Sequence, residues 1–254
     1  MSLVSASSIM GGIKEYGYRG IQQLPIVVTA TSLLFTITTG SVAHASLAAG
    51  LSIVIPLYTY VLHVLLRWLF SFSSMANSLS GFTRATGDTC NLVQKSDSNK
   101  LSYLNLAESF NSTTSATPEL IPSYWLMSVS FFIGYTITNA IDSLMIPAQE
   151  NANPENIEKR TYQAIYNIVA LSVFSLLVLG IRLGLMSDCE GRGKWGIGLS
   201  IVFAIGSMGI GRAMYNLSRT CGGRASDLLG ILSQILPASS TAPHPIVCTQ
   251  GNDD

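Results

Sequence analysis

The sequence predicts an all-α protein, a multi-pass transmembrane bundle of about five crossing helices with a short amphipathic helix near the C-terminus. Three observations predict this class. Charged residues make up only 11% of the 254 residues, against about 25% in soluble domains. The mean hydropathy is +0.41. Between Pro25 and Phe70 the only formal charge is Arg67, and a helix crosses a bilayer with about 20 apolar residues.

Residues 1–24 are expected to form an interfacial tail ahead of the first crossing. Tyr16 and Tyr18 lie beside Lys14 and Arg19, and tyrosines next to basic residues are typical of a membrane-interface anchor. Several glycines in this stretch disfavour a stable free helix.

Residues 25–70 are predicted to form a transmembrane helical hairpin. Its crossings cover residues 26–43 and 47–70, because in lipid the backbone must satisfy its own hydrogen bonds and a helix does so. The turn between them is placed at Gly40–Ser46, with His44 at its tip. Pro56 is expected to kink the second crossing.

Residues 71–121 form a polar extramembrane loop, in which Ser, Thr and Asn are frequent. Residues 122–217 then contain a three-helix transmembrane region, with crossings predicted at 123–146, 163–186 and 195–215. Asn153-Pro154 is typical of a helix start. The last crossing is rich in glycine, so four crossings are the alternative.

Residues 218–254 are expected to form a C-terminal tail. Within it, residues 227–236 place leucine and isoleucine against Ser233 and Gln234. A stretch of about ten residues is too short to span a bilayer, so an amphipathic helix on the membrane surface or against the bundle is expected.

Basic residues predict the orientation of the bundle. With five crossings and the N-terminus inside, nine Lys and Arg residues fall on the inner side and five on the outer side. Cytoplasmic loops carry the excess of Lys and Arg, so the N-terminus is predicted to be cytoplasmic and the C-terminus outside. The sequence does not specify which membrane holds the protein.

The four cysteines contain no C-x-x-C pair, so no metal site and no cofactor are expected. Under the predicted orientation Cys221 and Cys248 share the outer side, where a disulfide between them could form. Asn111 begins an N-glycosylation triplet. Asn111 is therefore a candidate for glycosylation, and its place on the predicted inner loop counts against the predicted orientation.

Asp142 is the most informative single residue, because a carboxylate inside a crossing is costly and often marks an ion pathway. Asn139 lies three residues earlier on the same helix face, and His63 lies near the end of the second crossing. These three residues are the candidates for an ion path. Polarity at the interface or between helices is the favoured explanation of Asp142, and a position at the membrane boundary is that of His63.

Small residues indicate where helices could pack closely. Gly180-x-x-x-Gly184 matches the spacing that lets membrane helices approach, and Gly206 belongs to the glycine-rich last crossing. Arg182, between the two spaced glycines, is expected to extend to the inner interface.

The motifs that would indicate an enzyme or a channel with a carbonyl selectivity filter are absent. The sequence contains no phosphate-binding loop, no H-E-x-x-H pair, no G-x-S-x-G elbow and no carbonyl filter of the TVGYG type. The formal net charge is zero, which excludes the basic field of a nucleic-acid binder.

The leading expectation is therefore a non-enzymatic structural, scaffolding or assembly component of a cellular, organellar or virion membrane. Such a protein contacts membrane lipid and either other membrane proteins or further copies of itself. The alternative is a small ion channel or ion-coupled carrier that uses Asp142 and Asn139.

Overall fold

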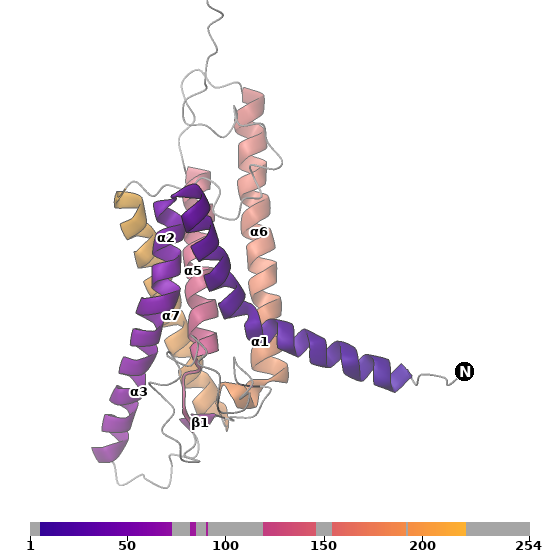
Figure 1. Ribbon diagram of the computed structural model, residues 1–254, viewed down its shortest axis with the longest axis vertical. Coiled ribbons are helices and arrows are strands. Elements are labelled where there is room, and N and C mark those ends of the chain that lie inside the picture. Colours follow the sequence, from indigo (N-terminus) through magenta and orange to yellow (C-terminus); the bar gives the residue numbers. More distant parts are fainter. Residues whose placement is uncertain are drawn as a thin grey trace, which may run out of the picture.

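The computed structural model describes residues 6–72, 82–84, 90, 119–145, 154–191 and 193–221. Six α-helices and two very short strands form this part of the chain (Figure 1): α1 (Ala6–Thr39), α2 (Val42–Ala49), α3 (Ile55–Phe72), β1 (Thr83–Arg84), β2 (Glu119–Leu120), α5 (Tyr124–Met145), α6 (Pro154–Leu185) and α7 (Gly193–Thr220). The strands pair antiparallel, with Thr83 opposite Leu120. The predicted 227–236 helix, Cys248 and Asn111 lie outside the described residues.

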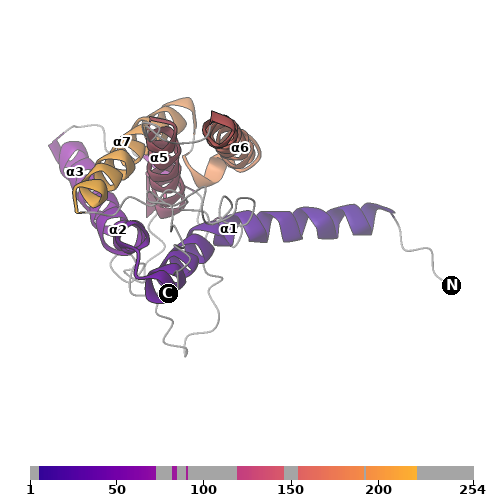
Figure 2. The same ribbon diagram turned by 90° about the horizontal axis from the view of Figure 1, so that it is seen from above.

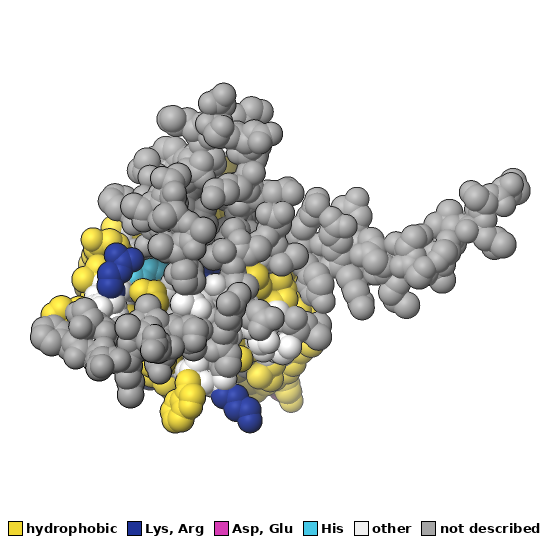
Figure 3. Space-filling model, turned by 90° about the horizontal axis from the view of Figure 1, so that it is seen from below, with side chains coloured by type: hydrophobic (Ala, Val, Ile, Leu, Met, Phe, Trp, Pro, Cys, Tyr) yellow, Lys and Arg dark blue, Asp and Glu magenta, His cyan; other side chains and the backbone are white. Residues whose placement is uncertain are grey.

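Four helical stretches of the described chain are long and apolar enough to cross a membrane. They are Gly20–Thr39, Val42–Leu69, Ala164–Gly184 and Lys194–Thr220. Large apolar side chains are exposed along them, such as Leu65 and Trp68 on α3 and Leu176 on α6. Figure 3, which looks at the end of the bundle that carries β1, shows hydrophobic side chains around its described margin. The arrangement is that of a helical membrane bundle, as the sequence predicts.

Helix α5 occupies the centre of the bundle. It runs between α6 and α7 when the bundle is viewed along its length (Figure 2), and most of its residues are buried. Most of its side chains therefore contact protein rather than lipid. A central position explains why α5 can carry Ser, Thr, Asn and Asp and yet belong to a membrane bundle: polar side chains are tolerated where they face the bundle interior.

The second predicted crossing is interrupted just before its proline. A π-helical turn, Gly50–Val54, joins α2 to α3, and Pro56 is the second residue of α3. Proline cannot donate a backbone hydrogen bond and its ring crowds the preceding turn. A widened turn on the N-terminal side relieves this crowding, so the predicted irregularity takes the form of a π-turn.

Two boundary predictions at the N-terminal hairpin are wrong. The stretch before Pro25 is helical, because α1 is continuous from Ala6 and the glycines do not end it. The turn is also tighter than predicted: Gly40 adopts a φ of 63°, a conformation that glycine adopts at no steric cost. Helix α2 then begins at Val42. His44 consequently lies buried within α2 rather than at a loop tip.

Glycines set the close approach of α5 and α7. A Cβ atom on Gly134 would overlap the backbone carbonyl of Met208, and one on Gly211 would overlap the carbonyl of Phe131. At Gly206 an added Cβ would lie 2.6 Å from the Tyr58 hydroxyl of α3.

Gly180 and Gly184 have no close neighbour among the residues that the structure describes. A Cβ atom on either glycine would meet nothing within 4 Å. Both residues lie on the exposed face of α6, whereas α6 packs on α5 through its opposite face, which carries Val178 and Arg182. Close helix contact in this chain therefore occurs at α7.

Candidate functional site

Two buried polar clusters lie near opposite ends of the bundle. The Glu190 cluster comprises Ser123, Trp125, Arg182, Glu190 and Ser200, and it joins the ends of α5, α6 and α7 nearest β1. The Asp142 cluster comprises Asn139, Asp142, Tyr215 and Arg219 and joins the other ends of α5 and α7. Both contain charged groups inside a helical membrane bundle, where charge is expensive. They are therefore the candidate sites.

The Glu190 cluster is built on a fully buried ion pair. Arg182 and Glu190 have no exposed side-chain surface, and Arg182 Nε lies 2.7 Å from Glu190 Oε1. The other carboxylate oxygen accepts a hydrogen bond from the Ser123 hydroxyl. Ser123 also caps α5, because its oxygen accepts the Leu126 amide at 3.1 Å. The expectation that Arg182 extends to the interface is wrong, since its guanidinium turns inward to a carboxylate.

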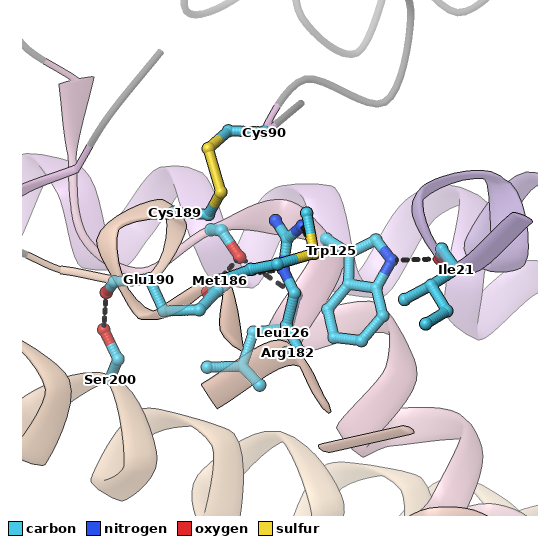
Figure 4. Close-up of polar contacts among 10 residues, drawn as sticks. Ile21, Cys90, Trp125, Leu126, Arg182, Met186, Cys189, Glu190 and Ser200 are labelled. Atoms are coloured by element: carbon cyan, nitrogen blue, oxygen red, sulfur yellow. Dashed lines mark hydrogen bonds and ion pairs between the residues drawn. A yellow bond between two sulfur atoms is a disulfide. The ribbon is translucent and has the colours of Figure 1, made fainter. Parts of the chain in front are cut away.

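Trp125 completes this cluster and fixes α1 to it. The Arg182 guanidinium carbon lies 4.8 Å from the centre of the Trp125 ring, within the range of a cation–π interaction. The Trp125 indole N–H donates to the Ile21 carbonyl at 2.7 Å. Figure 4 shows both contacts beside the ion pair. One side chain thus links the buried charge to the N-terminal helix.

A disulfide bridge covers the Glu190 cluster. Cys90 and Cys189 are joined across 99 residues of sequence, and both are buried. Cys221 carries a free, exposed thiol, so the expected Cys221–Cys248 bridge is not the one in the structure. The 3₁₀ turn Ser187–Cys189 directs Cys189 toward Cys90. Cys221 directly follows α7, which finishes at the opposite end of the bundle (Figure 1).

The Asp142 cluster brings together two residues that the sequence singled out. Asn139 Nδ2 donates to the Tyr215 hydroxyl at 3.3 Å, and that hydroxyl donates to Asp142 Oδ2 at 3.0 Å. The other Asp142 oxygen lies 2.7 Å from Arg219 Nη1. The Asp142 side chain is 9% exposed and that of Arg219 is 44% exposed. The carboxylate is therefore neutralised by a cation at the edge of the bundle.

His63 does not join this cluster. Its Nε2 lies 3.0 Å from the Pro122 carbonyl, just before α5 begins. Pro122 and Asn139 are 17 residues apart, which is about 25 Å along a helix. The three residues of the predicted ion path are therefore divided between the two ends of α5.

An apolar layer fills the bundle between the two clusters. Leu51, Ile55, Val129 and Phe131 are at most 1% exposed and belong to one hydrophobic core cluster. Gly50 makes room for the Phe131 ring, because an added Cβ would overlap it. Apolar side chains therefore separate the charged groups at one end from those at the other.

The described residues offer no set of metal ligands. Among residues 6–72, 82–84, 90, 119–145, 154–191 and 193–221, no three His, Cys, Asp or Glu side chains come together in a way that could hold a metal ion. The contacts within the two clusters are ion pairs and hydrogen bonds.

Comparison of the chain with protein-family models, with curated proteins and with solved structures finds no match. The assignment of function therefore rests on the chain's own residues.

Sequence reasoning missed Glu190 and the pairing of the cysteines. A signal for Glu190 was available: an arginine one turn from the end of a crossing needs a counter-charge if it turns inward, and Glu190 lies only eight residues further on. Arg219 offered a similar signal for Asp142. The pairing of Cys90 with Cys189 had no local signal, because four cysteines allow three connectivities.

Proposed function

We propose that this chain is a structural component of its membrane, a disulfide-clamped helical anchor that holds a polar segment outside the bilayer for contact with partner proteins. The observation that carries this proposal is the internal pairing of the buried charges. Arg182 is matched by Glu190, and Asp142 by Arg219. Groups paired in this way hold helices together and have little capacity left for chemistry, which favours a non-enzymatic role.

The disulfide supports a specific orientation within this proposal. Disulfides form and persist in oxidising compartments, so the end with Cys90 and Cys189 faces the exterior or an organelle lumen. The start of α1 lies toward the same end and α7 finishes at the other (Figure 1). With α5 counted as a fifth crossing, the N-terminus faces the oxidising side and the C-terminus the cytoplasm.

This orientation reverses the one predicted from basic residues. The excess of basic residues on the predicted inner side was modest. It included Arg182, which is buried and paired with Glu190 and so contributes no loop charge. A covalent bond that requires oxidation outweighs a small difference in loop charge. The Asn111 triplet then falls on the oxidising side, where N-glycosylation takes place in cells that carry out this modification.

Residues 85–118 are the proposed partner-binding segment. In the sequence they connect β1 to β2, whose pairing places Arg84 opposite Glu119. The bridge at Cys90 adds a second attachment to the bundle. A polar segment held at both ends loses less entropy on binding than a free tail would.

Replacement of residues 92–117 by a short Gly/Ser linker tests the proposal in the native membrane. We expect the wild type to form larger complexes on cross-linking. We expect the variant to lose these complexes while it keeps its thermal stability in detergent and its Cys90–Cys189 bridge. A variant that assembles into the same complexes as the wild type would refute the role of this segment.

An ion channel or carrier is the second candidate, and the burial of Asp142 and Asn139 in α5 is the observation that favours it. The ion pair with Arg219 and the apolar layer around Phe131 make it the weaker of the two. Ion flux into proteoliposomes tests it. Flux through the wild type that Asp142→Asn abolishes would establish transport, and absence of flux for every ion tested would remove this candidate.

A further inference from the structure

We infer that the Cys90–Cys189 bridge positions the Glu190 carboxylate against Arg182, so that the redox state of the bridge controls closure of this end of the bundle. The bridge and the ion pair then act as one unit. A disulfide that only shortened a loop would leave the ion pair unaffected. Figure 4 shows the bridge next to the charged groups.

The carboxylate of Glu190 depends on a single short turn for its position. The turn is closed by the Cys189 amide bonding the Met186 carbonyl at 3.0 Å and by the Glu190 and Gly191 amides bonding the Ser187 carbonyl at 3.0 and 3.1 Å. Cys189 directly precedes Glu190, so a covalent bond at Cys189 restrains the backbone of Glu190 as well.

Glu190 makes hydrogen bonds with residues of three helices. Its carboxylate accepts hydrogen bonds from Arg182 near the end of α6 and from Ser123 at the start of α5. Its carbonyl accepts the Ser200 hydroxyl of α7 at 2.6 Å. Displacement of Glu190 would therefore release contacts to α5, α6 and α7 together.

Arg182 makes that displacement costly. Its guanidinium is a cation that is completely buried, and its Nη2 atom has no hydrogen-bond partner among the described residues. Nη1 lies 3.8 Å from the sulfur of Met186, a weak acceptor. A buried cation whose carboxylate moves away must draw in water or open the end of the bundle.

The bridge also lies beside the cation (Figure 4). Cys90, Met186 and Cys189 form a small buried cluster of their own, next to the guanidinium. Reduction consumes two thiol molecules, RSH, and gives two cysteine thiols and one RSSR, so the protein gains the two electrons and two protons that the reagent loses. Without the bond, Cys90 can move away from Met186, the residue whose sulfur contacts the guanidinium.

Hydrogen exchange of the full-length protein in detergent, with and without dithiothreitol, tests the coupling. We expect reduction to speed exchange of the Glu190 and Gly191 amides by at least about tenfold, and to leave unchanged the α5 amides beside Gly134. Unchanged exchange at Glu190, or an equal increase over all helices, would overturn the inference.

A mutant cycle gives an independent readout. Loss of the bridge in Cys90→Ser/Cys189→Ser and loss of the counter-charge in Glu190→Gln should each lower Tm by about 5–15 °C. Their combination should lower it by clearly less than the sum, because either change alone frees the same turn. The matched control combines the cysteine changes with Asp142→Asn at the far end, for which additivity is expected. If the Glu190 combination is additive as well, the bridge and the ion pair are independent and the inference is wrong.

Discussion

Arg182 and Glu190 form an ion pair in which both side chains are fully buried and the charged atoms lie 2.7 Å apart. The pair joins α6 to the turn that leads into α7, and Ser123 extends it to α5. In the interior of a membrane bundle such a pair is stable only while both members are present, because removal of one leaves an uncompensated charge.

Glu190→Gln is therefore expected to destabilise the protein strongly, by about 3–5 kcal/mol. The glutamine keeps the shape and some hydrogen bonds but leaves the Arg182 charge unmatched. Thermal unfolding in detergent measures the effect. Asp142→Asn is the matched control: its partner Arg219 is 44% exposed, so water can solvate the freed guanidinium and a loss of about 1 kcal/mol is expected. Equal losses for the two variants would contradict this account of the buried pair.

Gly134→Ala should separate α5 from α7. The new methyl group would overlap the Met208 carbonyl, and overpacking against backbone costs about 1–3 kcal/mol. Gly180→Ala adds the same methyl group on α6 where nothing lies within 4 Å, and it should be neutral or slightly stabilising because alanine is the better helix former. A loss of stability for Gly180→Ala in the monomer would show that this face packs against something within the chain.

Tyr215→Phe should weaken the Asp142 cluster by about 1–2 kcal/mol. The hydroxyl accepts from Asn139 and donates to Asp142, so its removal leaves a buried amide and a carboxylate oxygen without that partner. Tyr60→Phe serves as the control, since Tyr60 is 47% exposed on α3 and its hydroxyl is accessible. The two variants should differ clearly in chemical or thermal unfolding; similar stabilities would indicate that water replaces the Tyr215 hydroxyl.

Peptide mapping under non-reducing conditions checks the connectivity directly. We expect one peptide pair linked through Cys90 and Cys189, and alkylation of Cys221 in the folded protein, because its thiol is free and exposed. A linked pair that contains Cys221 and Cys248 would contradict the structure and restore the expectation drawn from the sequence.

Hydropathy and helix signals predicted the helices well. The stretch expected to cross at residues 123–146 forms helix α5 at Tyr124–Met145, although α5 is not among the four described stretches that are long and apolar enough to span a membrane. The helix start expected at Asn153-Pro154 is the start of α6. These signals are local: a run of apolar residues and a proline at the first helical position are readable without knowledge of neighbours.

The polar contacts could not be predicted in the same way, because they depend on which helices are neighbours. The sequence identified Asn139 and Asp142 as polar residues that share one face of a helix and are costly to place in a membrane. Their partners Tyr215 and Arg219, however, come from a helix more than 70 positions away. The central place of α5 is likewise a property of the whole bundle. Its polar residues alone would have suggested a helix at the interface.

The most direct test of the proposed anchor is the accessibility of Cys221 in sealed endoplasmic-reticulum vesicles that carry a Cys248→Ser variant. Cys221 follows the last turn of α7, at the end away from the disulfide. If the disulfide end faces the oxidising lumen, a membrane-impermeant maleimide will label Cys221 from the cytoplasmic side without permeabilisation. Labelling that occurs only after the vesicles are opened with detergent would contradict the proposed orientation.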